Sequence, residues 1–155
     1  MPGSNGRDYW FLNTRVSVRV SCDEGQDRIS VLEHRAPHGD SPPLHIHRNE
    51  DEAFHILEGE IAFRLGEDDL HCRTGETVLT PKGVPHTYRV TSAEGARWLT
   101  VTAGEDFERF VRSLGREPNG DGLPPPSGPP TPEQAEGLGS AAARFGIDIV
   151  GPPLQ

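Results

Sequence analysis

Two stretches of this sequence decide its fold, GDSPPLHIHRNEDEAFHILEG at residues 39–59 and GETVLTPKGVPH at residues 75–86. In the first stretch, PLHIH predicts a short strand, on which His45 and His47 point to the same face because side chains alternate along a strand. Four polar residues follow and predict a turn, so Glu52, at the start of the next strand, can lie beside both imidazoles.

The second stretch supplies a third imidazole. Pro81 and Gly83 shape a tight turn, and His86 opens the strand that follows it. Three imidazoles and one carboxylate suit a first-row divalent metal ion, and iron, nickel, manganese, copper and zinc all remain open. A closed structural zinc site would more often use cysteines, and neither Cys22 nor Cys72 is close in sequence. The predicted metal ligands are His45, His47, Glu52 and His86.

The other four histidines belong to a plainer class. A lone His-x-His pair is a weak signal, and single histidines on strands are most often exposed or hydrogen-bonded within the sheet. We expect such surface or hydrogen-bonded positions for the remaining histidines, which are His34, His38, His55 and His71.

Residues 8–104 predict a succession of short strands. Polar and apolar residues alternate in segments such as TRVSVRVS, and turn signals rich in glycine, proline and aspartate separate the segments. No helical periodicity lies between these segments, which disfavours a parallel α/β sheet. We therefore predict an all-β sandwich or barrel as a domain that spans residues 1–104.

The chain beyond this domain, residues 105–155, has a different pattern. Apolar residues recur with the i, i+3, i+4, i+7 spacing of one helix face, which predicts a helix over residues 105–114. Residues 116–132 are rich in proline and glycine and predict an extended linker. Residues 133–155 predict a short helix, opened by a capping box at Thr131, and a terminal segment that forms a strand or a clamp across the barrel. The apolar residues of the first helix are Phe107, Phe110, Val111 and Leu114.

The composition excludes several classes of partner. The chain has 155 residues and a net charge of −9, with basic residues scattered among acidic ones, so we expect no binding to nucleic acid. No apolar run approaches the length of a membrane span, and residues 1–7 lack the apolar core of a signal peptide. We therefore expect a cytoplasmic protein that makes no membrane contact. In that compartment Cys22 and Cys72 should stay unpaired. We also expect the protein to be a homodimer.

The spacing of these residues resembles the two signature motifs of the cupin superfamily. The first pattern is Gly39, five residues, His45-x-His47, four residues, Glu52, six residues and Gly59. The second pattern is Gly75, five residues, Pro81-x-Gly83, two residues and His86. The short gap between the patterns also resembles that of small microbial cupins. Where the second motif often ends with asparagine, this chain has Val90, at a position that is not a ligand in the family.

The resemblance implies a double-stranded β-helix, or jelly-roll barrel, with a short helical C-terminal tail and one metal ion held by the motif residues. The segment FERFVRSLG, at residues 107–115, is similar to the segment that follows the barrel in bacterial monocupins of the quercetinase, or flavonol 2,4-dioxygenase, type. The resemblance therefore implies an oxygenase.

Residues that share a strand face with the metal ligands would line the barrel interior. Counting by two from Glu52 and His86 predicts apolar and aromatic walls, which suit a mostly apolar small molecule. The periodicity leaves open whether the set at residues 61–65 or the set at residues 98–102 faces inward. The predicted substrate-binding residues are Phe54, Ile56, Phe63 and Tyr88.

Three functions remain open, because cupins support many chemistries on one site. The first is a metal-dependent dioxygenase for an aromatic or enolisable substrate, in which O₂ reacts and Glu52 acts as ligand and proton acceptor in turn. The second is redox-neutral cyclisation, isomerisation or decarboxylation, with the metal as a Lewis acid. The third is a small-molecule binding module without turnover. A cupin transcription factor is disfavoured because residues 1–38 contain no helix-turn-helix pattern.

Overall fold

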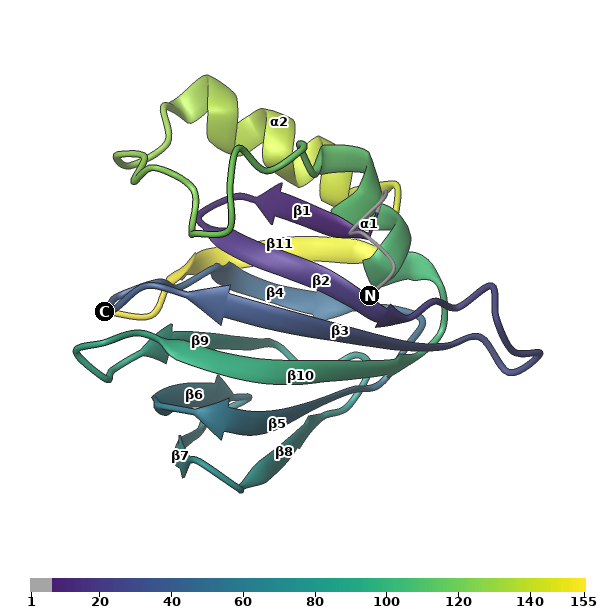
Figure 1. The fold of residues 1–155 in the computed structure, drawn as a ribbon, viewed down its shortest axis with the longest axis horizontal. Coiled ribbons are helices and arrows are strands. Elements are labelled where there is room, and N and C mark those ends of the chain that lie inside the picture. The colour runs from purple at the N-terminus through teal and green to yellow at the C-terminus, as the bar shows by residue number, and fades with distance from the viewer. Residues whose placement is uncertain (1–6) are drawn as a thin grey trace.

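Two antiparallel sheets lie face to face and build the barrel (Figure 1). A computed structural model describes residues 7–155, so most of the segment examined above for a signal peptide, residues 1–6, lies outside the described residues. The predicted all-β fold is confirmed. The strands are β1 (Asp8–Phe11), β2 (Thr14–Val20), β3 (Ile29–Ala36), β4 (Pro43–His47), β5 (Glu52–Glu58), β6 (Glu60–Leu65), β7 (Asp68–Arg73), β8 (Thr77–Thr80), β9 (His86–Val90), β10 (Ala96–Ala103) and β11 (Ile147–Pro153), and the helices are α1 (Asp106–Leu114) and α2 (Pro132–Ala143).

The strand order is that of a jelly roll. One sheet has the order β1-β2-β3-β10-β5-β8, and the other has the order β11-β4-β9-β6-β7. Strands far apart in the sequence are therefore neighbours, and β4 pairs with β9 so that His45 lies opposite His86. This pairing and that of β5 with β8 bring the two motif stretches together.

Alternation along the strands fills the space between the sheets. Buried and less buried residues alternate along β5, β6 and β10, because successive side chains point to opposite faces. Both sets left open by the sequence face inward, since Phe63 is 1% exposed and Trp98 is fully buried. The tight turn between β5 and β6 requires Gly59, whose φ is +88° and where a Cβ would lie 2.6 Å from the Gly95 carbonyl oxygen.

The C-terminal tail packs against one end of the sheets (Figure 1). The predicted helix is α1, and its residues Phe110 and Val111 are buried in a second apolar cluster with β1, β2 and β3. The predicted capping box at the start of α2 is present, because Thr131 and Gln134 each accept a hydrogen bond from the other's backbone amide. The terminal segment forms β11, an edge strand paired with β4.

The remaining sequence features have simple outcomes in the structure. Within the described residues, Cys22 and Cys72 are both buried and free, as expected. The linker packs along the barrel, where the Trp10 indole donates to the Gly122 carbonyl at 2.9 Å. Neither helix of the described chain is long and apolar enough to cross a membrane.

Candidate metal centre

Three strands bring the four predicted ligands together inside the barrel. His45 and His47 lie at the end of β4, Glu52 begins β5 and His86 begins β9. One ligand atom from each residue lies within 4.8 Å of the others. His47, Glu52 and His86 are at most 3% exposed, whereas His45 is partly exposed. The cluster is therefore buried, with one imidazole toward the outside.

The geometry of the cluster suits a metal ion. The Glu52 Oε2 atom lies 3.0 Å from His47 Nε2 and 3.4 Å from His86 Nε2. A metal bound to nitrogen and oxygen at about 2.1 Å requires neighbouring ligand atoms about 3–3.5 Å apart, so these separations already fit. None of these three buried atoms makes a hydrogen bond among the described residues, and a shared cation would satisfy all three.

Backbone carbonyls fix how two of the imidazole rings point. His45 Nδ1 lies 2.7 Å from the Pro43 carbonyl oxygen, and His86 Nδ1 lies 3.2 Å from the Val84 carbonyl oxygen. A carbonyl can only accept, so each Nδ1 carries the proton and each Nε2 keeps a free lone pair. Such outer hydrogen bonds are typical of histidines that bind metals through the other nitrogen.

The pKa shifts within the cluster also favour a bound cation. Burial lowers the pKa of His45 to about 3, helped by His86 and His47, so this ring stays neutral as a ligand must. Burial alone would lower the pKa of His47 and raise that of Glu52. Their mutual attraction outweighs burial, raising the pKa of His47 to about 10 and holding that of Glu52 well below its usual range. A carboxylate buried this deeply needs a positive charge beside it, either an imidazolium proton or a metal ion.

Glu50 is a buried carboxylate beside the candidate site that the sequence did not predict. It lies in the turn between β4 and β5, is 2% exposed and places Oε1 3.7 Å from His47 Nδ1. Glu50 therefore faces Nδ1 of His47. In His45 and His86 the same nitrogen faces a backbone carbonyl instead. Its sequence signal is weak, because a glutamate in a polar turn is most often exposed.

The structure corrects the expectation for His34. Instead of an exposed or hydrogen-bonded position, His34 is 4% exposed and its ring stacks between Trp98 and Phe107, at centroid distances of 5.1 Å and 5.8 Å. Neither ring nitrogen has a hydrogen-bond partner in the described chain. Burial lowers its pKa to about 4. The other three histidines expected at surface or hydrogen-bonded positions make polar contacts at exposed or partly exposed positions, as predicted; they are His38, His55 and His71.

The predicted substrate-binding residues all lie in the apolar cluster inside the barrel. Phe54 is the one that reaches the metal cluster, with its ring centroid 6.4 Å from that of His86. Tyr88 packs edge-on against Trp98, and its hydroxyl donates to Asp40 at 3.2 Å. Burial raises the pKa of Asp40 to about 6, against the hydrogen bond from Tyr88 that lowers it. The walls are thus aromatic, with one phenol already hydrogen-bonded.

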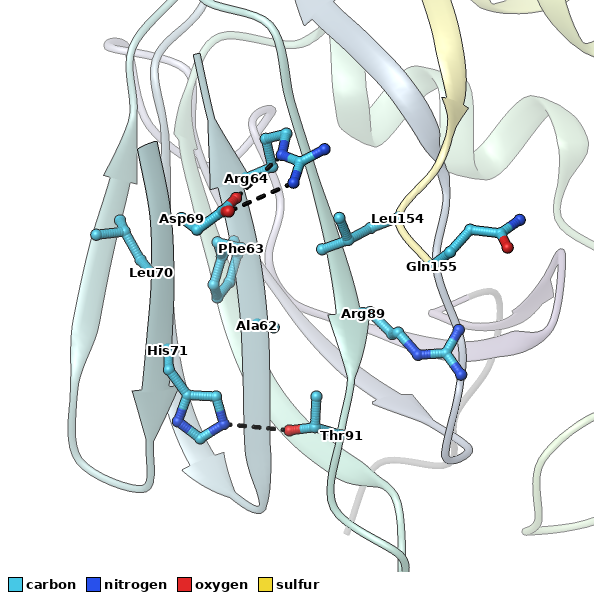
Figure 2. Close-up of a pocket in the computed structure, with 10 residues that line it drawn as sticks. All are labelled: Ala62, Phe63, Arg64, Asp69, Leu70, His71, Arg89, Thr91, Leu154 and Gln155. Atoms are coloured by element: carbon cyan, nitrogen blue, oxygen red, sulfur yellow. Dashed lines mark hydrogen bonds and ion pairs between the residues drawn. The ribbon is translucent and has the colours of Figure 1, made fainter. Parts of the chain in front are cut away.

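A separate groove of about 530 Å³ lies on the outer face of the second sheet (Figure 2). Arg64 and Asp69 form an ion pair of 3.0 Å there, and His71 lies 3.3 Å from the Thr91 hydroxyl. No candidate metal ligand lines this groove. The candidate metal centre therefore lies apart from this groove.

Comparisons with known proteins agree with this fold. A family model described as Cupin domain matches residues 31–102. Quercetin 2,3-dioxygenase of Bacillus subtilis (strain 168) is 26% identical over 87 residues, which are 56% of this chain and 26% of that protein. The chain thus spans about a quarter of the length of this relative. It belongs to the cupin superfamily.

Two solved structures show the same fold. A predicted oxalate decarboxylase from Thermotoga maritima superimposes with a TM-score of 0.55 at 24% identity, covering 58% of this chain and 79% of that one. The polyketide cyclase RemF from Streptomyces resistomycificus superimposes with a TM-score of 0.52 at 23% identity, covering 62% of this chain and 68% of that one. At such identities the likeness concerns the fold alone.

Proposed function

We propose that this chain is a metal-dependent dioxygenase for a small aromatic or enolisable substrate. The observation that carries the proposal is the convergence of three imidazoles and the Glu52 carboxylate inside an aromatic barrel. The match to a quercetin dioxygenase, at 26% identity, supports this reaction class over others. His45, His47, Glu52 and His86 would hold the metal.

Glu52 has the properties of a proton acceptor for the substrate. When bound, the metal would supply Lewis acidity toward a substrate oxygen and the redox chemistry with O₂. Burial would raise the pKa of Glu52, but the neighbouring imidazoles of His47 and His86 outweigh it and hold that pKa well below its usual range, so Glu52 is ionised. Its Oε2 faces the centre of the cluster, where it can take the proton of a substrate hydroxyl.

The barrel walls would orient the substrate and exclude water. Phe54, Phe63 and Tyr88 form a chain of ring contacts with centroid distances of 5.1–6.2 Å. Together with Ile56, which is fully buried, they offer planar apolar surfaces to an aromatic ring. These four residues are proposed substrate contacts.

Buried polar groups on β3 and β10 support a substrate that also carries hydrogen-bonding oxygens. The His34 ring nitrogens, Trp98 Nε1 and Thr100 Oγ1 have no partner among the described residues, and all three side chains are at most 4% exposed. Buried polar atoms left unpaired cost about 1–3 kcal/mol each, so a ligand oxygen at these positions would be strongly favoured. A polyhydroxylated aromatic meets both the apolar and the polar requirement.

A redox-neutral reaction is the second candidate. The same nitrogen and oxygen donors suit zinc, which would act only as a Lewis acid on a carbonyl. The fold is shared with a polyketide cyclase and a predicted oxalate decarboxylase, so cyclisation or decarboxylation is compatible with this barrel.

An oxygen-dependence experiment separates the two candidates. Wild-type protein loaded in turn with iron, manganese, nickel, copper or zinc is assayed with quercetin and simpler polyphenols, in air and under argon. The dioxygenase proposal requires stoichiometric O₂ uptake and no product under argon. Undiminished product formation under argon would contradict it and favour the redox-neutral candidate.

A matched pair of variants tests the role of Glu52. Glu52→Gln keeps an oxygen for the metal but cannot act as a base at neutral pH, so it should retain metal and lose about 10²–10⁴-fold in turnover. Glu58→Gln changes an exposed carboxylate at the far end of the same strand and should retain full activity. Equal activity of both variants would remove Glu52 from the mechanism.

A further inference from the structure

The C-terminal tail makes hydrogen bonds to the turn that joins β4 to β5. The Arg48 amide donates to the Gly146 carbonyl at 2.8 Å, and Asn49 Nδ2 donates to Asp106 Oδ2 at 2.7 Å. The Phe107 amide donates to Glu50 Oε1 at 2.8 Å. Three consecutive residues of the turn thus contact a segment that lies beyond residue 102, where the match to the family model ends.

Glu50 connects this tail to a metal ligand. Its Oε1 receives the Phe107 amide and also faces His47 Nδ1, at 3.7 Å, and both carboxylate and imidazole are almost fully buried. His47 Nδ1 makes no hydrogen bond to any described residue, and the Glu50 carboxylate is an acceptor placed to take its proton. A proton held on Nδ1 leaves Nε2 free to bind a metal.

We infer that Glu50 is the positioning residue for His47, and that helix α1 positions Glu50, so that the C-terminal tail is part of the metal centre. The inference rests on the metal assignment made above, but it does not depend on which reaction the metal supports. It extends the site from the four candidate ligands to a residue of the turn and an amide of the tail.

The first turn of helix α1 can bind a carboxylate from another part of the chain. The amide groups of the first turn of a helix lack partners within the helix and are usually satisfied by the N-cap side chain. The N-cap residue of α1 is Glu105, whose side chain makes no capping hydrogen bond among residues 7–155. Glu50 takes that role from another element, and the positive end of the helix dipole favours its charge.

Close packing leaves Glu50 little freedom to move. A Cβ at Gly104 would lie 2.4 Å from Glu50 Oε2 and 3.1 Å from Glu50 Cβ, so only glycine fits beside this carboxylate. The Phe107 ring also packs on the His47 ring, at a centroid distance of 5.8 Å. The tail therefore contacts both the ligand and the residue that orients it.

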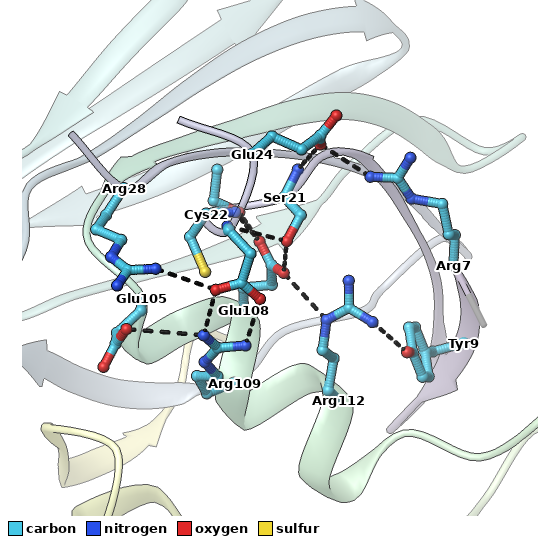
Figure 3. Close-up of polar contacts among 12 residues, drawn as sticks. Arg7, Tyr9, Ser21, Cys22, Glu24, Arg28, Glu105, Glu108, Arg109 and Arg112 are labelled. Atoms are coloured by element: carbon cyan, nitrogen blue, oxygen red, sulfur yellow. Dashed lines mark hydrogen bonds and ion pairs between the residues drawn. The ribbon is translucent and has the colours of Figure 1, made fainter. Parts of the chain in front are cut away.

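A buried network fixes α1 itself (Figure 3). Glu108 is fully buried and accepts hydrogen bonds from the Ser21 hydroxyl at 2.7 Å and the Cys22 amide at 2.8 Å. The Ser30 hydroxyl donates to the same carboxylate at 2.8 Å. These hydrogen bonds connect the helix to β3 and to the segment after β2. Glu108, which accepts them, lies beside Phe107 in the first turn of α1. The position of Glu50 is thus set by the barrel through α1.

The experiment measures metal affinity in the chain of 155 residues. Affinities for Zn²⁺ and Co²⁺ are determined by competition with a chelator, and the visible spectrum of the Co²⁺ form reports the coordination geometry. Glu50→Ala should weaken binding about 10–100-fold, the range seen when an outer partner of a ligand is removed, and should alter the Co²⁺ spectrum. Glu50→Gln keeps an oxygen that accepts the Nδ1 proton, so it should retain most of the affinity and the wild-type spectrum.

A second variant perturbs Glu50 without changing it. Gly104→Ala displaces the carboxylate and should weaken metal binding as Glu50→Ala does, whereas Gly137→Ala, where a Cβ meets no described atom within 4 Å, should not. Glu105→Ala, an exposed carboxylate at the start of the same helix, should also bind normally. Melting temperatures separate loss of fold from loss of affinity.

The opposing results are equally defined. Wild-type affinity and an unchanged Co²⁺ spectrum in both Glu50→Ala and Gly104→Ala would overturn the inference, whatever their melting temperatures. A loss in Glu50→Gln as large as in Glu50→Ala would also overturn it, because charge rather than orientation would then be the cause. If the wild type binds neither metal, the metal assignment fails, and the inference fails with it.

Discussion

Replacing His34 by phenylalanine should make the stability of this protein less sensitive to mild acid. His34 is 4% exposed and stacks between two aromatic rings, and burial lowers its pKa from 6.5 to about 4. Phenylalanine keeps a planar ring in the stack but has no proton to gain. The variant therefore isolates the cost of protonation at this position.

The sign and size of the effect follow from linkage between proton binding and folding. Well above pH 6.5 the imidazole is neutral in both the folded and the unfolded chain and contributes nothing to the pH dependence. Below pH 6.5 the imidazole is protonated in the unfolded chain, whereas His34 in the folded protein stays neutral down to about pH 4. The free energy of unfolding therefore decreases as the pH falls from 6.5 to about 4. At about pH 5.5, one unit below the unfolded pKa, the loss is about 1.4 kcal/mol relative to pH 7.5.

Urea unfolding of chelator-treated protein at the two pH values provides the assay. The fall in free energy of unfolding should be about 1.4 kcal/mol smaller for His34→Phe than for the wild type. His71→Phe changes an exposed histidine and should show the wild-type fall. Equal falls for the wild type and His34→Phe would refute the reasoning, because His34 would then take up its proton as easily in the folded protein.

Three further outcomes are expected. Replacing any one of the three candidate ligand histidines by alanine should remove most bound metal, measured by elemental analysis, while circular dichroism shows a folded barrel; full occupancy in all three variants would contradict the site. Phe110→Ala should lower the free energy of unfolding by about 3–5 kcal/mol, because its ring is 5% exposed and packs 5.3 Å from that of Phe11. Leu70→Ala, at a position 38% exposed, should cost much less, and similar costs would mean that α1 is not docked. Gly59→Ala should lower the melting temperature, since it combines a φ of +88° with a contact of 2.6 Å to a carbonyl, and Gly128→Ala is the control at an open position.

The fold and the cluster of four candidate ligands could be predicted because their signals are local. Alternation of apolar and polar residues predicts a strand whatever the rest of the chain does, and the same period places His45 and His47 on one face. Turn chemistry at Pro81 and Gly83 marks the start of the strand that carries His86. The helix at residues 105–114 followed from its spacing in the same way.

Other features depend on partners that no local pattern specifies. Phe63 and Trp98 both face inward, which became certain only when β6 and β10 took their places in two opposed sheets. The terminal segment became a barrel strand because β4 had a free edge beside it. Alternation gives the direction of a side chain relative to its own strand, but not which sheet the strand joins.

The two residues that the sequence most underrated, Glu50 and His34, show the same limit at the site. Each looks like an ordinary polar residue, one in a turn and one on a strand. The sequence by itself determined which four residues form the candidate cluster, because neighbouring residues and fixed spacings specify them. Only the tertiary structure decided that Phe107, more than fifty residues away in the chain, contacts both of these residues. Burial arises from long-range contacts, and burial turns a common imidazole or carboxylate into part of a functional site.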